Sequence, residues 1–97
     1  MATAITWSRV TEADVIRAIE DYDRLGASDF FEVHGYAPAT TYELVRGGST
    51  YPPKAILGTA YEFATGDRLA SPDFEGGKVG AVKVLAALGF EVRAKQG

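Results

Sequence analysis

The chain has 97 residues, of which 46% are hydrophobic, 24% charged and 11% aromatic, with a net charge of −3. This length predicts a single domain over residues 1–97 with one modest core, and the acidic balance argues against a protein that holds nucleic acid by a general positive field. The sequence has no cysteine, which excludes disulfides, a thiolate zinc site and a cysteine nucleophile.

The first predicted helix begins after Thr11 and ends at Gly26. Thr11 is a suitable N-cap residue, and Val10 and Val15 have the spacing of a hydrophobic staple. Apolar side chains then recur at steps of three and four, which predicts that one face is turned to the core. The acidic side chains of this helix are expected to lie in water: Glu12, Glu20, Asp21 and Asp23.

The next part of the chain predicts a helical turn and then a hairpin. Phe30 and Phe31 would anchor the turn, with Ser28 as its cap, and a loop follows. Residues 40–51 are β-prone on both sides of Gly47-Gly48, a tight-turn signal, so they predict a short antiparallel hairpin. Arg46 is expected to project from its tip.

Two more helices and a strand complete the predicted order. A second helix starts at Pro53, a residue tolerated in a first turn, and runs to about Ala64. A third covers about residues 78–88 and ends at Gly89, and residues 90–93 alternate as a final strand. The expected fold is α+β, with three main helices packed on a short antiparallel hairpin and a C-terminal strand. A winged-helix-like arrangement is one architecture that fits this order.

No apolar segment is long enough for a membrane span or has the features of a signal peptide, which predicts a soluble cytoplasmic protein without a membrane partner. Signals for chemistry are also weak. The single histidine, His34, cannot build a metal site by itself, and no phosphate-binding loop, dinucleotide fingerprint or nucleophile elbow occurs. Asp73 and Glu75 are more typical of capping or solvated groups than of an acid–base pair. We therefore expect no enzyme activity, no metal and no cofactor.

Charge is unevenly distributed along the chain. Residues 1–33 carry a net charge of −4 and residues 34–97 a net charge of +1, so a surface that meets an anion is expected in the second part. Gly76-Gly77-Lys78 before a helix could hold a phosphate or form a plain turn.

The hairpin segment has two interpretations. As a wing on nucleic acid, Arg46, Tyr51 and Lys54 would contact phosphate or base edges. As scaffold, Tyr51 would pack under the two prolines while Lys54 extends along the surface. Pattern alone supports both equally.

Several short motifs follow one another in the second part of the chain: Tyr51-Pro52-Pro53-Lys54-Ala55-Ile56, Gly66 and Leu69, Phe74 with Gly76-Gly77, and Leu88-Gly89-Phe90-Glu91-Val92. Their order and spacing resemble the N-terminal head domain of ScoMcrA-like, modification-dependent type IV HNH restriction endonucleases. The resemblance covers about residues 41–92, and residues 1–40 add a compatible leading helix. The chain departs from the full enzymes because it has one histidine and no HNH constellation, so cleavage would belong to a separate HNH domain.

The resemblance implies a non-catalytic module that binds double-stranded DNA, modified or unmodified, with an HNH nuclease domain in the same or another chain. The side chains expected to contact DNA are Arg46, Tyr51, Lys54, Lys78 and Lys83. Tyr36 and Tyr42, like Tyr51, are candidates to stack on a base, although a core position suits each of them as well. The alternative is a protein-interaction or dimerisation module, in which the aromatic surface around Tyr42 and Tyr51 meets a partner chain or a second copy.

Overall fold

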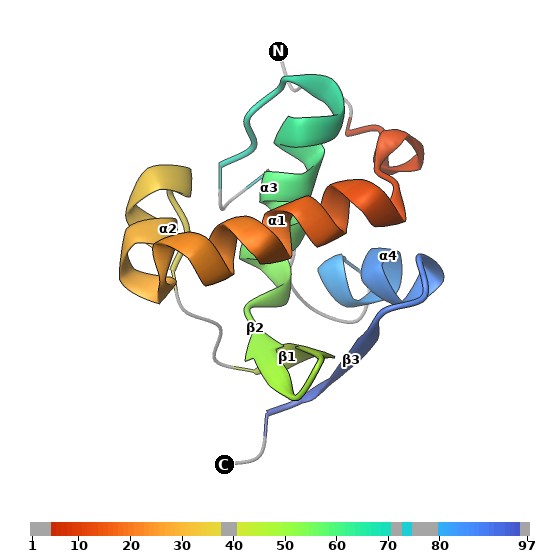
Figure 1. Ribbon diagram of the computed structural model, residues 1–97. Coiled ribbons are helices and arrows are strands. Elements are labelled where there is room, and N and C mark those ends of the chain that lie inside the picture. The colour runs from red at the N-terminus through yellow and green to blue at the C-terminus, as the bar shows by residue number, and fades with distance from the viewer. Residues whose placement is uncertain (1–4, 38–40, 71–72, 75–79, 96–97) are drawn as a thin grey trace.

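The computed structural model describes residues 5–37, 41–70, 73–74 and 80–95. Its elements in chain order are η1 (Trp7–Arg9), α1 (Glu12–Leu25), α2 (Ala27–His34), β1 (Tyr42–Arg46), β2 (Ser49–Tyr51), α3 (Pro53–Thr65), α4 (Ala81–Ala87) and β3 (Glu91–Ala94) (Figure 1). The predicted α+β class is confirmed, while the winged-helix-like form stays a prediction.

The start of α1 confirms the local signals in the sequence. Thr11 and Asp14 form a capping box, in which each side chain accepts a hydrogen bond from the backbone N–H of the other residue. Val10 and Val15, the two members of the predicted staple, are both buried. This arrangement supplies partners for backbone donors that a helix start otherwise leaves unpaired.

Residues 27–34 form a helix of two turns rather than the single turn that we expected. Gly26, with φ of 83°, ends α1 and is also the N-cap residue of α2. The proposed cap residue Ser28 lies inside the helix, and the Gly26 position has no side-chain cap. Because glycine adopts positive φ at little cost, the chain can turn sharply here and place Phe30 in the core.

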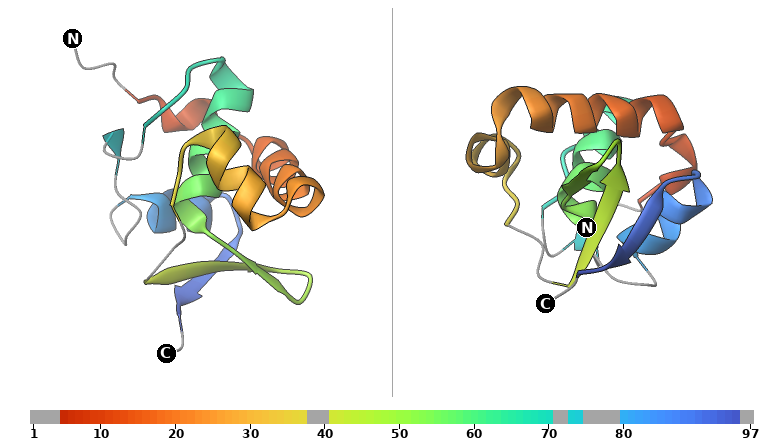
Figure 2. Two further views of the ribbon diagram at one scale, coloured as in Figure 1. Left: turned by 90° about the vertical axis from the view of Figure 1, so that its left-hand side faces the viewer. Right: turned by 60° about the horizontal axis from the view of Figure 1, so that its bottom comes forward.

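The three strands form one antiparallel sheet in the order β2-β1-β3. The hairpin turn is tight because Gly47 and Gly48 both have positive φ, 58° and 82°, as a two-residue turn of the primed type requires. Leu44 of β1 is fully buried and lies between Tyr51 of β2 and Val92 of β3. The sheet lies at one end of the molecule, with the helices gathered above it (Figure 2, left).

Helix α3 is the centre of the core. We expected one apolar stripe, but eight consecutive or nearly consecutive residues are buried: Pro53, Ala55, Ile56, Leu57, Gly58, Thr59, Ala60 and Tyr61. Helix α1 crosses it, and α2, α4, η1 and β1 also contact it (Figure 1). Because most sides of α3 are apolar, neighbouring elements must cover it on most sides to keep it from water.

Helix α4 is followed at once by the third strand. Gly89 has φ of 96° and the next residue, Phe90, is buried, so the predicted glycine end of this helix is confirmed. The first two residues of the predicted helix, Lys78 and Val79, lie outside the described residues. None of the helices that the structure describes is both long and apolar enough to cross a membrane.

The close contact between Gly58 and Tyr36 gives a first test. A Cβ at position 58 would lie 2.0 Å from the Tyr36 hydroxyl oxygen, which donates a 2.7 Å hydrogen bond to the Leu69 carbonyl. Helix propensity alone would make Gly58→Ala stabilising by about 1 kcal/mol. Overpacking and loss of the hydrogen bond outweigh this gain, so we expect a net loss of about 1–3 kcal/mol in the free energy of unfolding.

Thermal and urea denaturation followed by circular dichroism would measure this loss. Tyr36→Phe is the control, because it removes the hydroxyl but no ring packing and should cost about 1 kcal/mol. A Gly58→Ala protein as stable as the parent would contradict the packing described here.

Candidate functional site

Arg46 is exposed at the end of β1, directly before the tight turn. Its guanidinium carbon lies 5.7 Å from the centre of the Phe90 ring. Phe90 follows the end of α4, so this contact brings the hairpin tip beside the junction of α4 and β3. A cation over an aromatic face is attracted to it but keeps its outer N–H groups available.

The other predicted cations lie on different elements. Lys54 is half-buried in the first turn of α3, with Nζ 5.2 Å from the centre of the Phe74 ring. Lys83 is exposed on α4. Lys78, together with Gly76 and Gly77, lies outside the described residues. The structure thus places one cation at the hairpin tip, one at the root of the hairpin and one on α4.

Tyr51 is buried, with 6% of its surface exposed. Its hydroxyl donates to the Asp23 carboxylate, with oxygen–oxygen distances of 2.9 and 3.0 Å, and its ring packs edge-to-face on Tyr22. Burial, reinforced by the hydrogen bond and charge of Asp23, raises the pKa of Tyr51. Tyr51 therefore joins β2 to α1, and Asp23, which we expected only to face water, is its partner.

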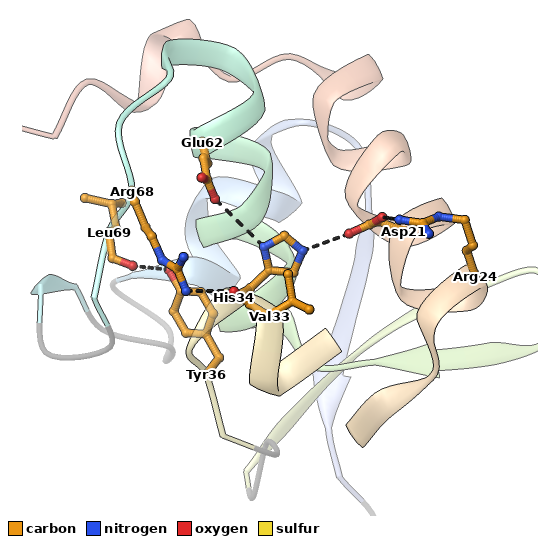
Figure 3. Close-up of polar contacts among 8 residues, drawn as sticks. All are labelled: Asp21, Arg24, Val33, His34, Tyr36, Glu62, Arg68 and Leu69. Carbon is orange, nitrogen blue, oxygen red and sulfur yellow. Dashed lines mark hydrogen bonds and ion pairs between the residues drawn. The ribbon is translucent and has the colours of Figure 1, made fainter. Parts of the chain in front are cut away.

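Tyr36 and Tyr42, the other two candidate base contacts, have different surroundings. Tyr36 is buried, and burial with the nearby Glu62 charge raises its pKa to about 12. Its hydroxyl is occupied by the Leu69 carbonyl (Figure 3). Tyr42 is half-buried at the start of β1. Of these two tyrosines, Tyr42 is the one whose ring can be reached from solvent.

Tyr42 forms part of a pocket of about 230 Å³ where the hairpin root meets the end of α1 and the start of α2. Its aromatic and apolar lining residues are Tyr22, Ala27, Phe31, Tyr42, Tyr51 and Pro52. Its three polar lining residues are Glu43, Thr50 and Lys95. The sequence predicts an aromatic surface at Tyr42 and Tyr51. It does not predict that Tyr22 and Phe31 belong to the same surface, because no local pattern shows that α1 and α2 meet the hairpin.

His34 lies at the end of α2 between carboxylates from two other helices (Figure 3). Nε2 is 2.8 Å from Oδ2 of Asp21, and Nδ1 is 3.8 Å from Oε1 of Glu62. A carboxylate can only accept, so Nε2 carries a hydrogen and donates to Asp21. The ring also packs against Phe30, with 4.6 Å between ring centres. His34 thus ties α1, α2 and α3 together.

The Asp21 carboxylate also bonds to Arg24, one helical turn away. Burial acts to raise the pKa of Asp21, but the hydrogen bonds and charges of His34 and Arg24 outweigh it and hold the pKa below its ordinary value of 3.8. No cluster of His, Asp and Glu among the residues that the structure describes could hold a metal ion. Asp21, His34 and Arg24 therefore form a structural clamp between helices. The prediction that the Asp21 side chain lies in water was wrong.

The far side of α2 is held by Arg68. Its guanidinium donates a 2.8 Å hydrogen bond to the Val33 carbonyl in the last turn of α2 (Figure 3). A cation at this end satisfies a carbonyl that the helix leaves unpaired and complements the helix dipole. Arg68 is thereby engaged in the scaffold.

Comparison with known proteins gives two matches. The family described as ScoMcrA-like, N-terminal head domain, matches residues 8–94. Among solved structures, the chain is similar to the type IV phosphorothioation-dependent restriction endonuclease ScoMcrA, with a TM-score of 0.61 and 27% sequence identity. That similarity covers 92% of this chain and 14% of the ScoMcrA chain. No curated protein matches.

The clamp around Asp21 predicts a pH-dependent loss of stability. Asp21→Asn should lower the free energy of unfolding at pH 7 by about 1.5–3 kcal/mol, the contribution typical of hydrogen bonds to a charged group. Because the folded-state pKa is lowered, the charged carboxylate stabilises the fold above the unfolded-state value near 3.8. That contribution is lost as the pH falls through the folded-state pKa.

Urea denaturation of both proteins from pH 7 down to pH 3 would measure the difference. The gap between parent and variant should be constant at neutral pH and shrink below about pH 4. Asp67→Asn is a matched control, since that exposed carboxylate bonds to none of the described residues, and it should change stability by less than about 0.5 kcal/mol. An undiminished gap at pH 3 would refute the role assigned to Asp21.

Proposed function

This chain belongs to the family of ScoMcrA-like N-terminal head domains, and from that premise we propose that it is a non-catalytic DNA-binding module that senses modified duplex DNA for a restriction endonuclease. The observation that carries the proposal is the family match over nearly the whole chain. ScoMcrA is a phosphorothioation-dependent restriction endonuclease, so phosphorothioate is the first modification to test.

The distribution of cations supports a contact surface on the hairpin and the elements beside it. Arg46 and Lys83 are exposed, and Lys54 lies at the hairpin root. Lysine and arginine side chains supply most of the affinity for DNA through contacts with phosphates. We assign these three, with Lys78, to phosphate or base edges, and we assign to Tyr51 the task of fixing the hairpin on α1.

Internal pairing of acidic groups also favours DNA binding by an acidic chain. Asp21 is bonded to Arg24 and His34, Asp23 to Tyr51, and Asp14 to the start of α1. These carboxylates belong to the acid-rich first third of the sequence. Their positions on α1 keep part of the negative charge away from the hairpin tip.

The proposed partner in catalysis is an HNH nuclease domain in the same or another chain, acting in the cytoplasm.

A second candidate function is protein interaction or dimerisation. The observation that favours it is the half-buried ring of Tyr42 in an apolar pocket, which a partner chain could cover as well.

The cationic surface predicts a salt-dependent loss of binding in a double variant. Replacing Arg46 and Lys54 by alanine should weaken duplex binding and reduce the slope of log Kd against log salt concentration by about 2, because two fewer counterions are released. Fluorescence anisotropy at several salt concentrations measures both quantities.

Two controls accompany this variant. Arg46→Lys with Lys54→Arg keeps both charges and should keep the slope. Arg9→Ala removes an exposed cation from η1, at the other end of the molecule from the hairpin (Figure 1). Equal effects of Arg9→Ala and the double variant would count against the hairpin surface.

The sensing function predicts a preference among modified duplexes. Otherwise identical duplexes would be compared, either unmodified or carrying phosphorothioate, 5-methylcytosine, 5-hydroxymethylcytosine or N6-methyladenine. We expect salt-sensitive binding that is about tenfold or more tighter for one modification, the effect of roughly 1.4 kcal/mol. No binding to any duplex at low salt, with a concentration-dependent dimer in light scattering, would replace the DNA proposal by the dimerisation module.

A further inference from the structure

The pocket at the hairpin root has the dimensions of a site for one ring system. Its volume of about 230 Å³ is below the ~300–1,000 Å³ of pockets that hold drug-sized ligands. It opens at the junction of the hairpin with α1 and α2, the same hairpin that carries Arg46 at its far end. A small planar group fits this space better than an extended chain.

Most of the pocket wall is rigid aromatic surface. Tyr22 packs edge-to-face on Tyr51 with 5.2 Å between ring centres, and it also contacts Phe31 at 6.3 Å. The Tyr51 hydroxyl is held by Asp23. These three rings are therefore held by contacts within the fold.

Tyr42 is the exception among the aromatic lining residues. Its side chain makes no hydrogen bond and no ring contact with another residue in the described ranges, and it is only half-buried. An aromatic ring with one face toward an apolar pocket can stack on a planar ligand, an interaction that tolerates any nucleobase.

The polar rim favours a neutral ring over a charged group. Glu43 is paired with Arg93 at 2.8 Å, so its charge is compensated. Thr50 and Glu43 bring hydrogen-bonding groups to the edge of the space. This combination suits a nucleobase, which has an apolar face and a polar edge.

We propose that this pocket accepts one unstacked nucleobase of the bound DNA, with Tyr42 as the stacking side chain. The inference rests on the proposed DNA-binding function and names the ligand of a site distinct from the phosphate contacts. Tyr42 and Arg46 lie at the two ends of β1, four residues and therefore about 13 Å apart, with the fully buried Leu44 between them. A phosphate can therefore contact Arg46 at the hairpin tip while a displaced base of the same DNA enters the pocket at the hairpin root.

The test compares three short DNAs of the same sequence by fluorescence anisotropy. The first is a fully paired duplex, the second carries a single unpaired base, and the third carries an abasic residue at that bulge. A base that is already unpaired costs least to displace. We therefore expect the base-containing bulge to bind about tenfold more tightly than either of the other two.

Variants of Tyr42 connect the preference to the pocket. Tyr42→Ala should remove the tenfold preference, whereas Tyr42→Phe, which keeps the ring, should retain it. Circular dichroism would establish that both variants are folded. As a second measurement, 2-aminopurine at the bulge should lose fluorescence on binding to the parent protein and not on binding to Tyr42→Ala, because stacking quenches it.

The outcomes separate this inference from the function on which it rests. Binding of all three DNAs with equal affinity would overturn the base pocket and leave the DNA-binding module standing. Equal binding of the base-containing and abasic bulges would also overturn it, since the protein would then recognise the bend. No binding to any DNA would overturn both, and a dimer that Tyr42→Ala abolishes would assign the pocket to a second copy of the chain.

Discussion

The rest of the structure depends on the need to cover α3 on nearly all sides. A short chain buries a limited share of its surface, so a helix with most of its first nine residues in the core draws every other element toward it. Helix α1 crosses it, α2 and α4 flank it, and the sheet closes its N-terminal end (Figure 1). Gly58 allows the Tyr36 side chain to come into direct contact with α3. One helix thereby sets the positions from which the hairpin and the pocket are built.

Polar side chains on α1 then fix its neighbours at defined angles. Asp21 accepts from His34 of α2, and Asp23 accepts from Tyr51 of β2, so two carboxylates two residues apart hold two different elements. Buried hydrogen bonds to charged groups are directional and costly to break. They therefore add orientation to the packing that α3 supplies.

These constraints separate the described candidate residues into those bonded within the fold and those accessible to solvent. His34, Tyr36, Tyr51 and Arg68 all have partners within the fold. Among the described candidates, Arg46 and Lys83 are exposed, and Tyr42 and Lys54 are half-buried. The similarity to ScoMcrA covers 14% of that chain. We propose DNA recognition for this module and cleavage for a separate part of such enzymes. In the proposed function, a hairpin held by hydrogen bonds beside an aromatic pocket would bind with a small ordering cost, because its side chains already have partners within the fold.

The sequence by itself determined the features that depend on residues within a few positions of one another. The Thr11 cap, the Val10–Val15 staple, the Gly47-Gly48 turn, the start of α3 at Pro53 and the end of α4 before Gly89 all follow from local chemistry. The family resemblance was also visible, since it depends on short motifs in order. Only the tertiary structure decided that α3 is buried on most sides, that Asp21 and Asp23 bond to side chains of other elements, and that Tyr22 and Phe31 join Tyr42 in one pocket. These features unite residues that lie far apart in the sequence: the bond from His34 to Asp21 spans 13 positions and the bond from Tyr51 to Asp23 spans 28. Periodicity reports which face of an element is apolar but not which distant side chain meets it.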